Sequence, residues 1–284
     1  MLEKFIDYLR LCRLNKPVGI WLLLWPTLWG LWFAAGGLPP LTVLWVFVLG
    51  TVLMRSAGCV INDVLDAKFD PHVARTRDRP IAAGRVTRSE GVRVFVGLSL
   101  IAYGITTKLN ITTVLLAIPA VIMAASYPLM KRYIALPQAY LGLAFSWGIP
   151  MGYAAVNGTV DWMGAGLLMA ANVCWVIAYD TFYAMVDRED DLKIGVKSAA
   201  VLFGRRDLLI TSLLHAAALA LLVVAGVRSG LGLIYFAGLT VAAVIALVLQ
   251  RRARSRTRVD AFAAFSQSHW FGVAVLLGLI FDTL

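Results

Sequence analysis

The sequence contains few charged residues, few histidines and few cysteines. Charged residues make up 15% of the 284 positions, whereas soluble domains usually contain about 25%. Three cysteines without a CxxC pair exclude a disulfide scaffold, and three separate histidines lack the spacing of zinc ligands. Hydrophobic residues make up 60% of the chain, and the mean hydropathy is +0.80. A soluble domain needs far more polar surface, so the composition predicts an integral membrane protein with several spans.

Nine apolar segments are long enough to span a membrane, which takes about 20 residues. They are Pro17–Ala35, Leu41–Asn62, Gly91–Thr107, Ile111–Met130, Leu136–Asn157, Trp162–Val186, Leu208–Val227, Leu231–Gln250 and Ala261–Ile280. With a cytoplasmic N-terminus, nine spans place all but three of the 26 Lys and Arg residues in the cytoplasm, as the positive-inside rule predicts. The sequence therefore predicts an all-α membrane protein whose C-terminus lies on the far side.

The positive charge of the chain is spread over several loops. The net charge is +10, and its excess on one side of the membrane indicates contact with anionic membrane lipid. Because the basic residues are scattered over separate loops, we expect no binding of nucleic acid.

Acidic residues concentrate where the second predicted span reaches the cytoplasm. Asn62, Asp66 and Asp70 are spaced four apart, and Asp63 lies beside them. This spacing predicts one stripe along a helix that continues from the span.

A second acidic stripe follows the sixth predicted span. Asp180, Asp187 and Asp191 fall at i, i+7 and i+11, which again places them on one helix face. The two segments align without a gap at an offset of 121 residues, which pairs Asp66 with Asp187 and Asp70 with Asp191. This offset predicts two related four-helix halves followed by a ninth helix.

The two acidic stripes predict a cation site. Stacked carboxylates repel one another, and more so at a membrane boundary. Oxygen ligands with no His or Cys nearby favour Mg²⁺ over zinc. Mg²⁺ is commonly held by carboxylates and substrate phosphates together, so two clusters predict two ions facing one diphosphate, with Arg75, Arg79 and Lys193 near its remaining oxygens. The alternative is a solvated face of acids paired with nearby bases.

The acidic segments resemble two motifs of the UbiA family of membrane prenyltransferases. Asn62–Asp70 fits the NDxxDxxxD motif and Asp187–Asp191 fits the DxxxD motif. Other segments resemble the branch of the family that acts on 4-hydroxybenzoate: Arg13–Gly19, Arg75–Pro80, Tyr127–Tyr133, Leu136–Gln138 and Tyr183–Asp187. The resemblance covers nearly the whole chain, as a single domain over residues 1–284 with motif loops at 62–90 and 180–207.

This resemblance implies a fold and an activity. The fold is a nine-helix bundle around a central cavity. The activity is the transfer of a polyprenyl chain from polyprenyl diphosphate to the ring carbon ortho to the hydroxyl of 4-hydroxybenzoate. This reaction is an early step of ubiquinone biosynthesis in the bacterial inner membrane.

The resemblance also assigns roles to individual residues. The implied Mg²⁺ ligands are Asn62, Asp63, Asp66, Asp70, Asp187 and Asp191. The candidate catalytic residues are Asp66, Asp180, Asp187, Asp191 and Arg132. We expect Asp180 or Asp187 to accept the ring proton, and the departing diphosphate is the alternative acceptor. The implied bases for the diphosphate are Arg75, Arg79, Lys131, Arg132 and Lys193.

Arg55 is the one basic residue deep inside a predicted span, since Arg93 lies at the edge of another. Arg55 precedes Asn62 by seven residues and therefore shares its helix face. Because an idle arginine inside a membrane is costly, we interpret Arg55 as the partner of the acceptor's carboxylate. The alternative is that Arg55 neutralises the nearby acidic residues.

Three other functions are alternatives. In the first, the same prenyl transfer acts on a different acceptor, such as a naphthoate, homogentisate or a haem precursor. A cation-coupled transporter would also use a repeat with buried acids, but its site would lie near the bilayer midplane. A phosphatidyl-alcohol transferase would carry a DGxxAR signature, which this sequence lacks.

Overall fold

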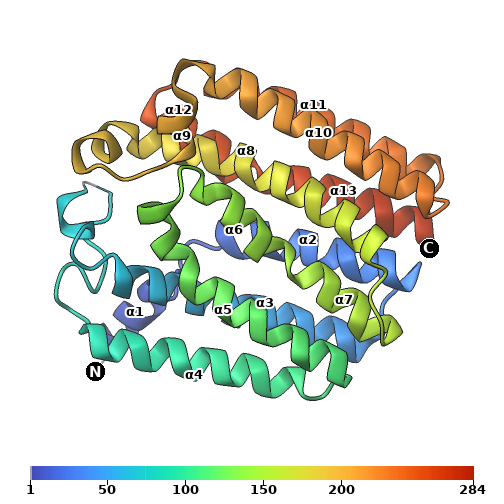
Figure 1. Cartoon of the computed structure of the whole chain (residues 1–284), viewed down its shortest axis with the longest axis horizontal. Helices are drawn as coiled ribbons and strands as arrows, with labels where there is room; N and C mark the ends of the chain where they lie inside the picture. The colour runs from blue at the N-terminus through green and yellow to red at the C-terminus, as the bar shows by residue number, and fades with distance from the viewer. Residues whose placement is uncertain (1, 74) are drawn as a thin grey trace.

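The computed structural model describes residues 2–73 and 75–284, and over these residues it is helical without strands. The α-helices are α1 (Leu2–Leu11), α2 (Val18–Ala35), α3 (Leu41–Leu65), α4 (Arg88–Thr106), α5 (Ile111–Tyr133), α6 (Pro137–Ser146), α7 (Gly148–Asn157), α8 (Trp162–Ile194), α9 (Ala199–Phe203), α10 (Asp207–Arg228), α11 (Leu233–Ala253), α12 (Arg258–Gln267) and α13 (His269–Thr283). Two short 3₁₀ turns are η1 (Asp70–His72) and η2 (Gly204–Arg206). Figure 1 shows one bundle, with α3, α4 and α5 along one edge and α10, α11 and α13 along the other. The predicted all-α fold is confirmed.

Within residues 2–73 and 75–284, seven helical segments are long and apolar enough to cross a membrane. The other two predicted spans do not form long apolar helices. The span at 91–107 corresponds to α4, which carries Glu90 and Arg93 in its first turns. The span at 136–157 is divided into α6 and α7, which meet at Trp147. The count of nine therefore stays a prediction. The last span is divided at Ser268, inside the polar run that interrupts its apolar sequence.

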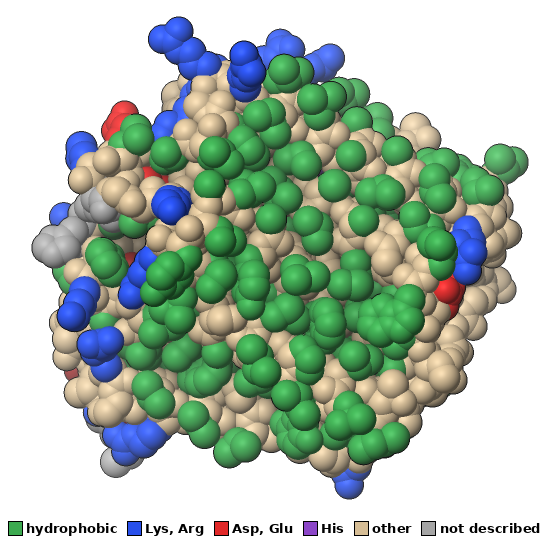
Figure 2. All heavy atoms as spheres, viewed as in Figure 1, with side chains coloured by type: hydrophobic (Ala, Val, Ile, Leu, Met, Phe, Trp, Pro, Cys, Tyr) green, Lys and Arg blue, Asp and Glu red, His purple; other side chains and the backbone are tan. Residues whose placement is uncertain are grey.

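Hydrophobic side chains cover the middle of the face shown in Figure 2, and Lys and Arg gather mainly at the end that carries α1, α9 and α12. Leu100, Ile122 and Leu247 are each more than half exposed. Contiguous exposed apolar surface of this extent is typical of a protein that contacts lipid.

Helix length places both acidic motifs at the same end of the bundle. α8 has 33 residues and is therefore about 50 Å long at 1.5 Å per residue, against about 30 Å for the hydrocarbon core. Its final turns, with Asp187 and Asp191, therefore extend beyond the apolar band. α3 ends at this same end, near α1, whereas α13 ends at the opposite one (Figure 1).

The first acidic stripe is not one continuous helix. α3 ends at Leu65, and the carbonyl of Asp66 accepts from the backbone N–H groups of Phe69 (2.8 Å) and Asp70 (2.9 Å). Asp70 begins the separate turn η1. The prediction of a single helix through Asp70 is wrong, because α3 ends at Leu65 and Pro71 disfavours α-helical backbone at the residue before it.

Packed aromatic rings fix the helices that carry the site. Trp175 of α8 lies 5.4 Å from Trp29 of α2 and 5.2 Å from Phe271 of α13, measured between ring centroids. The indole N–H of Trp29 donates to the carbonyl of Gly272 at 3.1 Å. Because all three rings are fully buried, they hold α2, α8 and α13 in a fixed relation.

Candidate active site

A cavity of about 1470 Å³ lies among α2, α3, α5, α6 and α8. Apolar side chains line its inner region, such as Leu23 of α2, Phe47 of α3 and Phe145 near the end of α6. Polar side chains near the ends of α3 and α8, including Asn62 and Asp187, line its mouth. The cavity therefore joins an apolar chamber to a charged opening.

The acids of the first motif are buried and paired with bases. Asp66 is 9% exposed, and its Oδ2 lies 3.3 Å from the Lys131 ammonium at the end of α5. Asp70 is 5% exposed and accepts from Arg79 Nη1 at 2.9 Å. Both predicted bases, Lys131 and Arg79, thus lie beside motif carboxylates.

Asp63 was predicted to bind the metal, but in the structure its carboxylate pairs with two arginines. Its side chain is 1% exposed, and Arg13 Nη2 donates to its two oxygens at 2.9 and 3.0 Å. Arg79 Nη1 donates to the same carboxylate at 3.0 Å. Asp63 therefore joins the segment after α1 to the loop after α3.

The second motif meets this loop through Arg75. The Nε of Arg75 lies 3.0 Å from each oxygen of Asp187, and its guanidinium also donates to the hydroxyl of Tyr183. The guanidinium carbon lies 4.5 Å from the centre of the Tyr183 ring. Because Arg75 follows α3 and Asp187 belongs to α8, this contact joins the two motifs at one opening.

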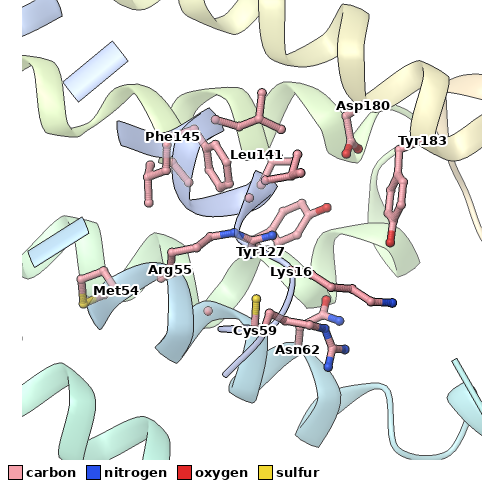
Figure 3. Close-up of a pocket in the computed structure, with 18 of the residues that line it drawn as sticks. Lys16, Met54, Arg55, Cys59, Asn62, Tyr127, Leu141, Phe145, Asp180 and Tyr183 are labelled. Atoms are coloured by element: carbon pink, nitrogen blue, oxygen red, sulfur yellow. The ribbon is translucent and has the colours of Figure 1, made fainter. Parts of the chain in front are cut away.

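The structure brings most of the predicted site residues to this cavity. Its lining includes Asn62, Asp63, Arg55, Arg75, Arg79, Lys131, Asp180, Asp187 and Asp191. Figure 3 shows Asp180 and Tyr183 extending from α8 into the space opposite Asn62. Asp66 and Asp70 lie beside the lining and contact it through Lys131 and Arg79.

Two predicted bases lie elsewhere. Arg132 donates to the carbonyl of Leu65 at 2.9 Å and covers the ring of Phe69 at 5.2 Å, so it holds the turn after α3. Lys193 is exposed, outside the residues that line the cavity. For these two residues, direct contact with a diphosphate stays a prediction.

The donor atoms of the two motifs suit a hard cation. All are oxygens from Asp and Asn side chains, which match the ligands that Mg²⁺ prefers. Over residues 2–73 and 75–284, no three His, Cys, Asp or Glu side chains form a group that could hold a metal ion. This arrangement fits Mg²⁺, which is usually bound by one or two carboxylates together with substrate phosphates rather than by a complete protein cage.

Electrostatic shifts follow from these contacts. Burial raises the pKa of Asp70 above its ordinary value, although the Arg79 guanidinium acts in the opposite direction. Burial favours the neutral form of Arg75, but Tyr183 and Asp187 outweigh it and raise the pKa of Arg75. Arg75 therefore stays charged at every working pH.

Arg55 extends from α3 into the cavity beside Tyr127 (Figure 3). Within the part of the chain that the structure describes, its Nε is buried without a hydrogen-bond partner, and its guanidinium carbon lies 5.7 Å from the centre of the Phe145 ring. No acidic residue in the same part lies within 4.0 Å of its guanidinium nitrogens to form a salt bridge. The structure thus gives no support to the alternative role of Arg55 as a counter-ion for the motifs.

The structure adds residues that sequence reasoning had not assigned. Arg13 and Lys16 lie at the cavity mouth, and Tyr127 and Tyr183 lie inside it. Tyr183 could have been found, because the offset of 121 residues pairs it with Asn62. Arg13, Lys16 and Tyr127 lie in segments that carry the family resemblance. Phe145 has no signal in the sequence.

Comparisons with known proteins identify relatives of this chain. The sequence pattern of the UbiA prenyltransferase family matches residues 23–273. A 4-hydroxybenzoate octaprenyltransferase of Xanthomonas campestris pv. campestris is 52% identical over 277 residues, which is 98% of this chain and 92% of that protein.

Solved structures share the fold. A UbiA homolog from Aeropyrum pernix is 25% identical and superimposes with a TM-score of 0.83, over 95% of this chain and 99% of that one. A UbiA homolog from Archaeoglobus fulgidus, bound to GPP and Mg²⁺, is 18% identical with a TM-score of 0.70 over 95% and 99% of the two chains. The chain described here belongs to the UbiA prenyltransferase family.

Proposed function

We propose that this protein transfers a polyprenyl chain from polyprenyl diphosphate to the ring carbon ortho to the hydroxyl of 4-hydroxybenzoate, with Mg²⁺, in ubiquinone biosynthesis. One observation carries the proposal: the acidic motifs of α3 and α8 meet at the mouth of an apolar cavity that also contains Arg55. The name of the Xanthomonas relative supports both substrates. The proposed location is the bacterial inner membrane, with the N-terminus and the motifs in the cytoplasm.

Asn62, Asp66, Asp70, Asp187 and Asp191 would hold Mg²⁺, directly or through water, as two ions. When bound, Mg²⁺ supplies positive charge that stabilises the departing diphosphate. The complex of the Archaeoglobus homolog with GPP and Mg²⁺ supports a metal of this kind.

Basic residues at the mouth would bind the remaining phosphate oxygens. Arg75, Arg79 and Lys131 already face this opening, where they pair with motif carboxylates. Arginine matches phosphate geometry with two parallel donors. When a diphosphate enters, these bases would therefore exchange the motif carboxylates for phosphate oxygens.

The cavity wall would protect the reacting carbon from water. The bond between the allylic carbon and the diphosphate oxygen breaks, and the new bond joins that carbon to the acceptor ring. Apolar walls exclude water, and aromatic ring faces in such a wall can stabilise positive charge by about 0.5–2 kcal/mol. The ring then loses its proton, and Asp180 or Asp187 is the proposed acceptor.

Arg55 would hold the acceptor by its carboxylate. It lies seven residues before Asn62, which corresponds to about 10.5 Å along α3 at 1.5 Å per residue. One benzoate ring fits between Arg55 and the motifs, with its hydroxyl end toward them. This orientation places the carbon ortho to the hydroxyl near the allylic carbon.

An activity assay tests the proposal. Purified protein in detergent with Mg²⁺ should join polyprenyl diphosphate to 4-hydroxybenzoate and release diphosphate. Asp66→Ala and Asp187→Ala should each lower kcat by at least about a hundredfold, whereas Glu3→Ala, exposed in the first turn of α1 and outside the cavity lining, should not. A preference for a naphthoate would overturn the acceptor, and failure to prenylate any aromatic acid would overturn the proposal.

A further inference from the structure

Gly19, near the start of α2, lies directly against the guanidinium of Arg55. A Cβ atom built on Gly19 would lie 2.5 Å from Nε and 2.8 Å from Cζ of Arg55, and would also contact Nη2. Side chains do not tolerate such distances. The Arg55 guanidinium therefore occupies the space that any side chain at position 19 would need.

Packing rather than bonding holds this guanidinium. Within residues 2–73 and 75–284, Arg55 makes no hydrogen bond or salt bridge that could fix its orientation, and its buried Nε is unpaired. Its neighbours are the α2 backbone at Gly19 and the Phe145 ring at 5.7 Å. In Figure 3 the side chain runs from α3 along the cavity with its guanidinium beside Tyr127. A buried charged donor without a partner is costly, and an anion bound in the cavity would remove this cost.

We propose that Gly19 is a positioning residue that determines specificity for a carboxylated acceptor. The absent side chain leaves a slot between α2 and Phe145, and this slot directs the Arg55 guanidinium toward the bound aromatic ring. The inference rests on the proposed function, because it takes the acceptor's carboxylate as the anion that Arg55 binds.

An alanine at position 19 would displace Arg55 rather than the helix. The clashing atoms are the far end of a flexible side chain, and the adjoining cavity of about 1470 Å³ gives it room to move. Gly30 differs, because a Cβ there would lie 2.8 Å from the Cα of Ile149 and would force two backbones apart. Alanine also favours helix over glycine. Gly19→Ala should therefore fold normally with a misplaced guanidinium.

Steady-state kinetics of four variants test this role: Gly19→Ala, Arg55→Ala, the double variant, and Gly97→Ala as the matched control. Gly97 lies within α4, outside the cavity lining, and its Cβ would meet nothing within 4 Å. The assay measures KM and kcat for 4-hydroxybenzoate, KM for the prenyl diphosphate, and the uncharged acceptor 4-hydroxybenzamide.

Arg55→Ala should raise KM for 4-hydroxybenzoate by about ten- to hundredfold, the effect of losing a charge-assisted hydrogen bond. Gly19→Ala should raise it at least about fivefold, with KM for the prenyl diphosphate unchanged within about twofold. Both variants should lose the preference for 4-hydroxybenzoate over the benzamide. In the double variant, Gly19→Ala should add nothing to the effect of Arg55→Ala, because residues that act through one contact are not additive. Gly97→Ala should match the wild type.

The outcomes separate the two proposals. If Arg55→Ala leaves KM for 4-hydroxybenzoate unchanged, the proposed acceptor site of Arg55 is wrong, and the inference on Gly19 falls with it. If Arg55→Ala raises KM but Gly19→Ala does not, or if the two effects simply multiply, only the role of Gly19 is overturned. A Gly19→Ala protein that raises both KM values equally would indicate general disturbance and would also overturn it.

Discussion

Asp63→Asn is the sharpest test of how the cavity mouth is held together. The Asp63 carboxylate is 1% exposed and receives Arg13 at 2.9 and 3.0 Å and Arg79 at 3.0 Å. Asparagine keeps the shape but removes the charge, and its amide group places a donor against two guanidinium donors. The substitution therefore leaves two arginines without their shared counter-ion.

The expected loss of stability follows from these contacts. Removing one partner of a buried ion pair costs about 3–5 kcal/mol. The side chains of Arg13 and Arg79 are 23% and 14% exposed, so solvent screening lowers the estimate to about 2–3 kcal/mol. One kcal/mol corresponds to roughly 2 °C or slightly more in a chain of this size. We therefore expect the Tm to fall by about 4–6 °C.

Tryptophan fluorescence during heating in detergent measures this Tm. Asp78→Asn is the matched control, because Asp78 is 88% exposed and lies 4.0 Å from Arg77 in the same loop; its Tm should stay within about 1 °C of the wild type. Equal Tm values for both variants would refute the structural role of Asp63. If Asp63→Asn kept its Tm but lost Mg²⁺-dependent activity, Asp63 would be the metal ligand that the motif predicts.

Two further predictions concern the reaction. Arg75→Ala should raise KM for the prenyl diphosphate about tenfold or more, because it removes a charge-assisted phosphate contact. Arg77→Ala is the control, because the Arg77 side chain is 67% exposed. Equal KM values for the two variants would contradict the role of Arg75. Complete removal of divalent ions by a chelator should abolish product formation, and added Mg²⁺ should restore it; activity that persists without divalent ions would contradict the metal role of the acidic motifs.

The sequence predicted the second acidic motif more accurately than the first. Asp180, Asp187 and Asp191 share α8, as their spacing requires. Asn62, Asp66 and Asp70 were expected on one helix, but α3 ends at Leu65. Helical periodicity predicts which residues share a face only as far as the helix continues. Beyond the end of α3, the position of Asp70 depends on partners elsewhere in the structure, such as Arg79.

The sequence contained less information on residues whose contact partners lie far away in the chain. Asp63 was assigned to the metal with its motif, yet it contacts Arg13, which lies 50 positions away in the chain. Gly19 lies in a segment that carries the family resemblance, but its spatial partner Arg55 is on another helix. No pattern within either segment reports such a contact.

The sequence alone determined the membrane-spanning helical fold, the two oxygen-rich motifs and the unusual arginine inside a span. These features depend on composition and on spacing along one helix, which the bilayer and the helical repeat translate directly into structure. Only the tertiary structure decided that Arg75 joins the two motifs, that Asp63 holds two arginines, and that Gly19 makes room for Arg55. Such contacts arise from the packing of helices that are distant in the chain, because packing fixes which side chains share the same space.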